Sequence, residues 1–296
     1  MKQELPNITV IGDLILDRYL IGDATKLNPE QPGVVIRVDK EEDRLGGAAA
    51  VAMIAAGFGA QVTLAGVVGR DEAGDRLRRL IDAHNIVPHL WIDDRPTTWK
   101  QRIVARGQLR PDRCDREVTT SISDHAAQFL SAVALGDMVL VSDYGKGVCT
   151  RGLLSLLADR AGKMSILVDP AHGRDWSDYG PVTLIKANWL EAVEAGDCRD
   201  VSPLALARLL SDKHERHVVV TIGRHGLVCA ERDGLTCYLP AEPTDVRDVC
   251  GAGDTVLASL GTAILAGYSL REACGFALAA ARQQIANVGI STIATC

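Results

Sequence analysis

The residues best suited to carry out chemistry form one short run late in the chain, Asp248-Val249-Cys250-Gly251-Ala252-Gly253-Asp254. The small residues Gly251, Ala252 and Gly253 would let successive backbone N–H groups point at one spot, and a helix N-terminus attracts anions. Asp254 would place a carboxylate beside that spot. An anion cradle next to a general base is what phosphoryl transfer to a hydroxyl requires. A glycine loop with a helix-capping Asp explains these residues alone equally well.

The segments that must position this run alternate between two patterns. Short runs rich in Val and Ile predict buried strands at 7–11, 62–68, 138–141, 165–168, 183–185 and 218–222. Helical spacing of apolar residues predicts helices at 48–57, 71–84, 123–135, 151–161 and 204–213, and one long helix at 256–281. Such alternation predicts an α/β fold, with a Rossmann-like, mostly parallel sheet flanked by helices.

Two stretches interrupt this rhythm, at about 19–39 and 89–117. They contain strand-like pieces with Pro, Gly and many charges, and no helical pattern. We expect them to pair into a small β-sheet lid over the site. No repeat or linker is visible, so residues 1–296 are predicted to form a single domain. Exposed strand edges on the lid could pair between subunits, which predicts a homodimer through the lid.

Composition sets the surroundings. The formal net charge of -6 argues against a nucleic-acid partner. No apolar run approaches the roughly 20 residues that a membrane span requires, and no signal-peptide core is visible. Eight cysteines are dispersed without a C-x-x-C pair, which favours reduced thiols over disulfides or a zinc site. We therefore expect a cytoplasmic protein with no membrane partner.

Polar residues follow several of the predicted strands. They are Asp13, Asp143, Asp169, Asn188 with Glu191, and Thr221. Each one alone fits a turn or a helix cap. Together they predict a ligand site, because ligands of open α/β sheets bind at the carboxyl ends of the strands.

These motifs resemble the ribokinase-like (PfkB) carbohydrate kinases over essentially the whole chain. The resemblance is carried by Leu45-Gly46-Gly47-Ala48-Ala49, Asn188-x-x-Glu191, Thr221-x-Gly223-x-x-Gly226 and the run from Asp248 to Asp254. Within the family, the chain most resembles the heptose 7-phosphate kinases of lipopolysaccharide precursor synthesis. That likeness is carried by Gly12-Asp13-x-x-x-Asp17-Arg18-Tyr19, Asn28-Pro29-Glu30-x-Pro32 and Ser142-Asp143-Tyr144-x-Lys146-Gly147.

The resemblance implies a role for each matched residue. Asp254 would be the catalytic base, and the amides of Gly251, Ala252 and Gly253 would form the anion hole. Substrate-binding roles fall to Asp13, Asp17, Gly46, Gly47, Lys100, Arg106, Asp143 and Lys146. Nucleotide-binding roles fall to Asn188, Thr221, Gly223 and Gly226. Glu191 would hold Mg²⁺ of Mg-ATP through water. Asp248 and the carbonyl of Cys250 are candidates for a monovalent cation, K⁺.

A phosphorylated sugar would need cations remote from the base, and Lys100 and Arg106 match the heptose kinase pattern. The alternative is that the lid charges form a solvated face. Three positions depart from the family pattern: Ala50 and Gly107 stand where Asn is usual, and Leu278 replaces an Asn near the adenine pocket. These departures bear on which sugar and nucleotide are accepted.

The prediction is an ATP-dependent sugar kinase acting on a sugar phosphate, at the anomeric (1-) hydroxyl of D-glycero-D-manno-heptose 7-phosphate. Two alternatives stay open: another PfkB-type sugar or nucleoside kinase, or a non-catalytic sugar-binding protein of the same fold. The bifunctional relatives carry a nucleotidyltransferase domain after the kinase, whereas this chain stops at Cys296. We therefore expect nucleotide activation of the product to require a separate protein.

Overall fold

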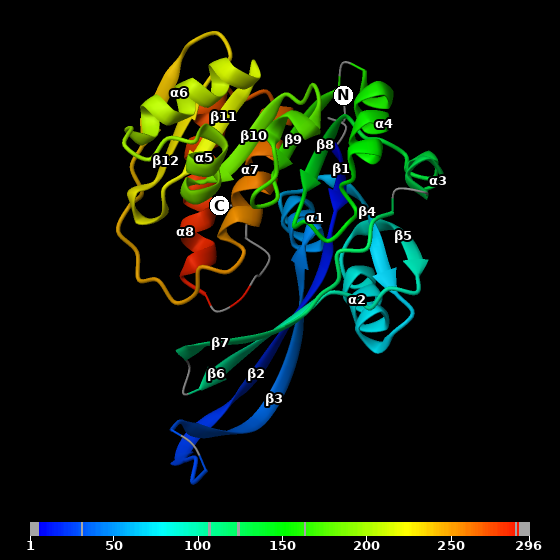
Figure 1. Cartoon of the computed structure of the whole chain (residues 1–296), viewed down its shortest axis with the longest axis vertical. Helices are drawn as coiled ribbons and strands as arrows, with labels where there is room; N and C mark the ends of the chain where they lie inside the picture. Colours follow the sequence, from blue (N-terminus) through cyan, green and yellow to red (C-terminus); the bar gives the residue numbers. More distant parts are fainter. Residues whose placement is uncertain are drawn as a thin grey trace.

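The computed structural model describes residues 6–30, 32–105, 108–122, 125–162, 164–287 and 289. Within them, nine strands form one large sheet in the order β13-β12-β11-β10-β9-β8-β1-β4-β5, and four form a small sheet in the order β3-β2-β6-β7. The large sheet is parallel from β5 to β11, and the β12–β13 hairpin joins it antiparallel. Figure 1 shows the small sheet as a curled ribbon extending away from the body. The predicted Rossmann-like α/β fold with a β lid is confirmed.

The strands of the large sheet are short and mostly apolar, as expected for strands buried on both faces. Their bounds are β1 Asn7–Gly12, β4 Gln61–Gly69, β5 Ile86–Asp93, β8 Met138–Ser142, β9 Ser165–Asp169, β10 Leu184–Asn188, β11 His217–Thr221, β12 Leu227–Ala230 and β13 Thr236–Leu239. None of the helices in the described ranges is long and apolar enough to cross a membrane.

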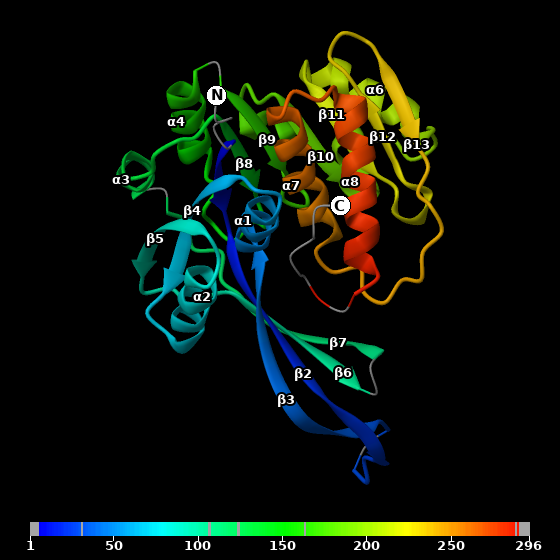
Figure 2. The same ribbon diagram turned by 180° about the vertical axis from the view of Figure 1, so that it is seen from behind.

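Helices cover both faces of this sheet, and each face has its own apolar core. One face is covered by α1 (Ala48–Gly57), α2 (Glu72–Asp82), α7 (Ala252–Leu265) and α8 (Leu270–Ile285), which Figure 2 shows in front. The other face is covered by α3 (Ala126–Ser131), α4 (Arg151–Ala161), α5 (Trp189–Gly196) and α6 (Pro203–His214). Helices α1 and α7, which are far apart in the sequence, therefore pack against the same side of the sheet.

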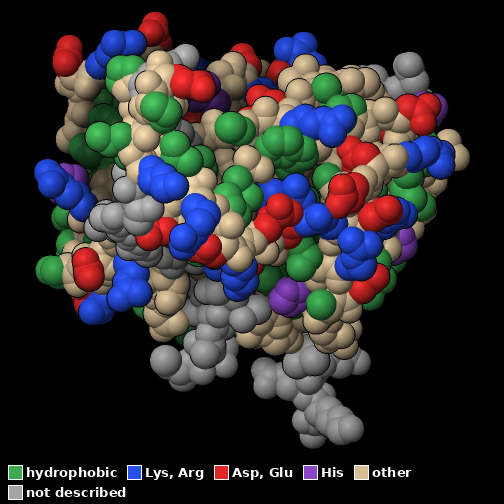
Figure 3. All heavy atoms as spheres, turned by 90° about the horizontal axis from the view of Figure 1, so that it is seen from below, with side chains coloured by type: hydrophobic (Ala, Val, Ile, Leu, Met, Phe, Trp, Pro, Cys, Tyr) green, Lys and Arg blue, Asp and Glu red, His purple; other side chains and the backbone are tan. Residues whose placement is uncertain are grey.

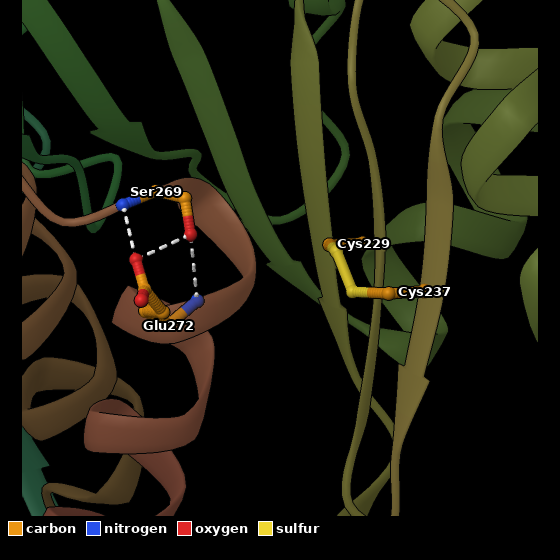
Figure 4. The surroundings of a disulfide bond; sticks show 4 residues. All are labelled: Cys229, Cys237, Ser269 and Glu272. Atoms are coloured by element: carbon orange, nitrogen blue, oxygen red, sulfur yellow. Dashed lines mark hydrogen bonds between the residues drawn. A yellow bond between two sulfur atoms is a disulfide. The ribbon is translucent and has the colours of Figure 1, made fainter.

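The long helix expected at 256–281 is wrong, because the segment divides into α7 and α8. Gly267 has a φ of 91°, which suits a glycine and ends the first helix. Ser269 then caps α8, and its hydroxyl and backbone N–H exchange hydrogen bonds with Glu272 (Figure 4). This capping box starts a new helix within a stretch whose Ala-rich composition reads as continuous.

The expectation that the thiols are reduced is wrong for one pair. Cys229 on β12 and Cys237 on β13 are joined by a disulfide, shown in Figure 4. The hairpin register places these two residues directly opposite each other, which brings their side chains within bonding distance. The other cysteines in the described ranges are free: Cys114, Cys149, Cys198, Cys250 and Cys274.

The lid is built from β2 (Leu14–Leu27), β3 (Val34–Gly47), β6 (Trp99–Ala105) and β7 (Gln108–Arg116). Its predicted boundaries need two corrections. The β2–β3 hairpin extends beyond the predicted 19–39 at both ends, to 14–47. The prediction missed its base because these residues are largely apolar and resemble the core of the body. Residues 89–93 belong to β5 of the large sheet and not to the lid.

An ion-pair network ties the base of the lid to α2. Asp43 on β3 accepts from Arg18 on β2 at 2.8 Å and from Arg76 on α2 at 2.7 Å. Arg76 also pairs with Glu41 and, within α2, with Glu72. Because Asp43 is shared by two arginines from different elements, the network fixes where the lid leaves the body.

Candidate active site

The run singled out in the sequence forms the N-terminus of α7. Gly251 is the N-cap with a φ of 74°, a left-handed conformation that favours glycine. Ala252 donates its N–H to the carbonyl of Val249 at 3.3 Å. The N–H groups of Gly251 and Gly253 have no acceptor within the described ranges. Two of the three predicted anion-hole amides are thus available to a ligand, at the positive end of the helix.

Asp254 lies in the first turn of α7 and is only 3% exposed. Burial, followed by the nearby negative charge of Asp169, raises the pKa of the Asp254 carboxyl to about 7. Tyr144 opposes this rise, because its hydroxyl donates to Oδ1 of Asp254 at 2.9 Å. A carboxylate that titrates near neutral pH is well matched to taking a proton from a hydroxyl.

A buried cation lies beside the anion hole. Lys186 on β10 pairs with Asp169, the last residue of β9, at 2.6 Å. A Cβ added to Gly253 would lie 3.0 Å from the Lys186 ammonium, so this cation faces the helix terminus. Burial alone would lower the pKa of Lys186, but Asp169 reverses the direction and the pKa is raised. Lys186 therefore stays charged next to the backbone amides.

Sequence reasoning did not identify Lys186 as a site residue. It occupies the centre of β10, Leu184–Asn188, between the predicted strand at 183–185 and the Asn188-x-x-Glu191 motif. The missed signal was a lysine directly after a strand, 183–185, that was predicted to be buried on both faces. Such a lysine needs a partner, and a functional site is where such partners gather.

Asp13 and Asp143, both predicted to bind the substrate, hold the loop after β8 in this structure. Asp13 accepts from the backbone N–H groups of Tyr144, Lys146 and Val148, at 2.8, 3.0 and 3.1 Å. Burial and the charge of Asp143 raise the pKa of Asp13 to about 6. The described residues thus engage both oxygens of Asp13 in shaping this loop.

Asp143 is similarly engaged. It accepts from the Gly145 N–H at 2.8 Å, from Arg174 at 2.7 Å and from the Tyr179 hydroxyl at 2.8 Å. Lys146 directs its ammonium to Glu117, 2.7 Å away. These partners fix the loop that carries Tyr144, which places the loop beside Asp254.

The base of the lid contributes the other acceptor-side residues. In the β2–β3 register, Gly46 and Gly47 face Ile15 and Leu14. A Cβ on Gly46 would lie 2.5 Å from Oδ2 of Asp17, so only glycine leaves room for that carboxylate. Asp17 is buried and paired with Arg102 of β6.

Two lid cations have different settings. Lys100 of β6 lies over the ring of Tyr144, 5.2 Å from its centroid, and burial lowers its pKa. Arg106, also predicted to bind phosphate, lies outside the described residues. Figure 3 shows Lys and Arg side chains interspersed with Asp and Glu on the face seen from below. Many lid charges are paired, for example Arg113 with Asp115.

The Asn188-x-x-Glu191 motif forms a capping box at the start of α5. Asn188 accepts from the Glu191 N–H at 3.0 Å, and Glu191 accepts from the Asn188 N–H at 2.8 Å. Burial, followed by the charge of Asp169, raises the pKa of Glu191. No group of three or more metal-ligating side chains occurs in the described ranges. Glu191 thus offers a single carboxylate near Asp169, which suits an outer, water-mediated contact with Mg²⁺.

The predicted nucleotide side lies where β11 ends. Thr221 is the last residue of β11, and Gly223 and Gly226 both have positive φ, at 59° and 98°. A Cβ on Gly226 would lie 2.1 Å from the carbonyl oxygen of Leu239, so the turn packs tightly on β13. A separate cavity of about 660 Å³ lies between residues 243–247 and α8.

Asp248, the candidate for a monovalent cation, also has internal partners. Its Oδ1 accepts from the Cys250 N–H at 2.9 Å, and its Oδ2 accepts from the Gly289 N–H at 2.8 Å. Asp248 therefore braces the loop that leads into the anion hole.

Known proteins are similar to this chain in sequence and in fold. The pattern of the pfkB family carbohydrate kinases matches residues 5–295. The bifunctional protein HldE of Pseudomonas paraeruginosa (strain DSM 24068 / PA7) is 38% identical over 307 residues, covering 99% of this chain and 64% of that protein. HldE of Shewanella sp. (strain MR-4) is 36% identical over 305 residues, with the same coverage. The chain thus spans about two-thirds, 64%, of these relatives.

Solved structures agree on the fold. Phosphofructokinase-2 from Escherichia coli, in complex with substrates and products, superposes with a TM-score of 0.82 at 19% identity, covering 98% of this chain and 96% of that one. Ribokinase from Thermotoga maritima gives 0.77 at 18% identity, covering 97% and 95%. With the family pattern matching nearly the whole sequence, the chain belongs to the pfkB family carbohydrate kinases.

Proposed function

We propose that this sugar kinase uses ATP to phosphorylate the anomeric hydroxyl of a heptose 7-phosphate, D-glycero-D-manno-heptose 7-phosphate. The observation that carries the transfer chemistry is the buried Asp254, whose pKa is raised to about 7, at the N-terminus of α7. The resemblance to heptose 7-phosphate kinases and the likeness to HldE support the acceptor.

In the proposed reaction, Asp254 accepts the proton of the sugar hydroxyl as the hydroxyl oxygen bonds to the γ-phosphorus of ATP. The bond between that phosphorus and the bridging oxygen of ATP breaks, and ADP leaves. The free N–H groups of Gly251 and Gly253 would hold the transferring phosphoryl oxygens, and the adjacent Lys186 would add a fixed positive charge. Because these groups are in place beforehand, little reorganisation is needed during transfer.

Mg²⁺ supplies charge neutralisation on the nucleotide phosphates when bound. We propose that Glu191 orients this Mg²⁺ through water. Its half-buried carboxylate interacts electrostatically with Asp169 and Lys186. K⁺ is a further proposed cofactor, placed at the Asp248–Cys250 loop. The likeness to phosphofructokinase-2, one structure of which is in complex with potassium, supports testing it.

The sugar phosphate would contact the lid side of the site. Lys100 and Arg102 bring two positive charges from β6 toward Asp17 and Tyr144. Lys100 is half-buried, and this favours a phosphate over a neutral sugar, because an anion would offset its desolvation. Arg102 is buried and is already paired with Asp17.

We also propose a homodimer through the lid. Four large apolar side chains, Leu27, Val34, Val35 and Val38, are at least 39% exposed on the β2–β3 hairpin, whose outer strand β3 is a sheet edge. A partner subunit would cover them. Light scattering should give twice the chain mass of 31.6 kDa, and a monomer at micromolar concentration would contradict this part.

The function is tested by ADP release with Mg-ATP across heptose 7-phosphate, fructose 6-phosphate, ribose and nucleosides. Turnover confined to heptose 7-phosphate, with phosphate found on the anomeric oxygen by ³¹P NMR, would support the full proposal. Turnover with another acceptor would retain the kinase and refute the heptose. Such a result would focus attention on Ala50, which is fully buried in α1.

A further inference from the structure

Tyr144 is the one described side chain that hydrogen-bonds to the carboxylate of Asp254. Its hydroxyl donates to Oδ1 at 2.9 Å, while Oδ2 has no hydrogen-bond partner within the described ranges. The two oxygens of this carboxylate are therefore not equivalent. One is occupied by the protein, and the other is left for a ligand.

The backbone of Tyr144 is held independently of its side chain. Its N–H donates to Asp13 at the end of β1, and the following loop amides of Lys146 and Val148 bind the same carboxylate. The phenol thus projects from a braced loop, and its hydroxyl is delivered to α7 in a defined place. Such support is what separates a positioning contact from a chance surface contact.

The face of the Tyr144 ring meets the lid. The Lys100 ammonium on β6 lies 5.2 Å from the ring centroid, within cation–π range. A positive charge over a phenol strengthens the hydroxyl as a donor. Tyr144 is therefore in contact with the lid through its ring and with the base through its hydroxyl.

We propose that Tyr144 is the positioning residue of the general base: its hydroxyl occupies Oδ1 of Asp254, so that only Oδ2 is presented to the acceptor hydroxyl, and its ring couples lid residue Lys100 to the base. The inference rests on the proposed role of Asp254 as the base. It adds a residue to which neither the sequence motif nor the family pattern had given a role.

The charges around Asp254 define what removal of this contact does. Asp169 at the end of β9 and Asp17 on β2 raise the pKa of Asp254, whereas Tyr144 and Lys186 lower it. Burial keeps the pKa of Tyr144 well above its ordinary value, so the phenol remains a donor throughout the neutral range. Losing its hydroxyl must therefore raise the pKa of the base.

The test is the pH profile of kcat/KM for Tyr144→Phe, which keeps the ring over which Lys100 lies. We expect the acidic limb to move up by about one pH unit, since a hydrogen bond to a charged group is lost. At pH 7 this leaves about one-tenth of the base ionised instead of half, an approximately fivefold loss that disappears above about pH 9. A second variant, Tyr144→Met, must shift the limb in the same direction.

The matched control is Tyr268→Phe, an exposed tyrosine in the turn between α7 and α8, which should leave the profile unchanged. Lys100→Met, which keeps Tyr144 intact, should move the limb up by a few tenths of a pH unit. Unfolding midpoints of all variants establish that they are folded.

The outcomes separate this inference from the function on which it rests. Asp254→Asn that retains turnover would remove the proposed base, whatever Tyr144 does. An inactive Asp254→Asn together with an unshifted limb in folded Tyr144→Phe would refute the positioning role and leave the kinase intact. An unshifted limb in Lys100→Met alone would refute the coupling to the lid.

Discussion

The raised pKa of Asp254 implies that the active site is maintained at the expense of stability. Replacing Asp254 with Asn keeps the shape of the side chain and an oxygen that can accept from Tyr144, but it removes the buried charge. We therefore predict that Asp254→Asn abolishes turnover and makes the folded protein more stable at alkaline pH.

The magnitude follows from the shift of the pKa from 3.8 to about 7. Because the folded carboxyl holds its proton more tightly than the unfolded one, the native state binds more protons between these values, and stability falls as pH rises through that window. At about 1.4 kcal/mol per pKa unit, the raised pKa lowers the free energy of unfolding by about 4 kcal/mol at pH 9, and by about 2 kcal/mol at pH 5, where only the unfolded state ionises.

The assay is denaturant unfolding of the wild type and Asp254→Asn at pH 5 and pH 9. The advantage of the variant should grow by roughly 2–3 kcal/mol between the two conditions. For a chain of 296 residues, the full 4 kcal/mol corresponds to roughly 6 °C in unfolding midpoint. A wild type at least as stable as the variant at pH 9 would refute the claim that burial holds this carboxyl near neutrality.

Three further predictions concern the anion hole and the β12–β13 hairpin. Gly253→Ala should lower kcat by about 100-fold, because its methyl group would lie 3.0 Å from the Lys186 ammonium. The control is Gly152→Ala, at a helical glycine with room for a Cβ. This variant should retain full activity and gain about 0.5–1 kcal/mol in free energy of unfolding. Lys186→Met should also reduce kcat by about 100-fold and raise the pH of the acidic limb, since Lys186 lowers the pKa of the base; an unchanged limb would contradict this. In protein purified without reductant, adding dithiothreitol to reduce the Cys229–Cys237 disulfide should lower the free energy of unfolding by about 2 kcal/mol. Identical unfolding curves with and without dithiothreitol would show that the bond is not formed.

The sequence predicted those elements whose apolar pattern is regular. The helices at 48–57 and 151–161 match α1 and α4 residue for residue. Helix α5 was not predicted, because only eight residues follow its capping box and they had been assigned to a ligand motif. The division between α7 and α8 depends on local turn chemistry, which composition conceals.

For the site, sequence reasoning identified the residues that converge at the strand ends, but it could not assign their partners. Asp13, predicted to bind sugar, accepts hydrogen bonds from loop amides, while Lys186, to which no role was assigned, lies beside the N-terminus of α7. Hydrogen-bond partners of this kind lie more than 100 residues apart in the chain. They become visible only once the strand order is known.

The continuity of β1 with the lid has an evolutionary consequence. The chain leaves the large sheet at Gly12, runs directly into β2 at Leu14, and returns through β3 into α1 at Ala48. The proposed acceptor-side residues therefore precede residue 150, whereas Lys186 and the proposed anion hole and nucleotide turn follow it. A lineage could exchange the first portion, or accumulate changes in it, and acquire a new acceptor while inheriting the phosphoryl-transfer apparatus intact. Chimeras that exchange residues 14–47 and 99–116 between relatives would make such an exchange of the acceptor side in a single step.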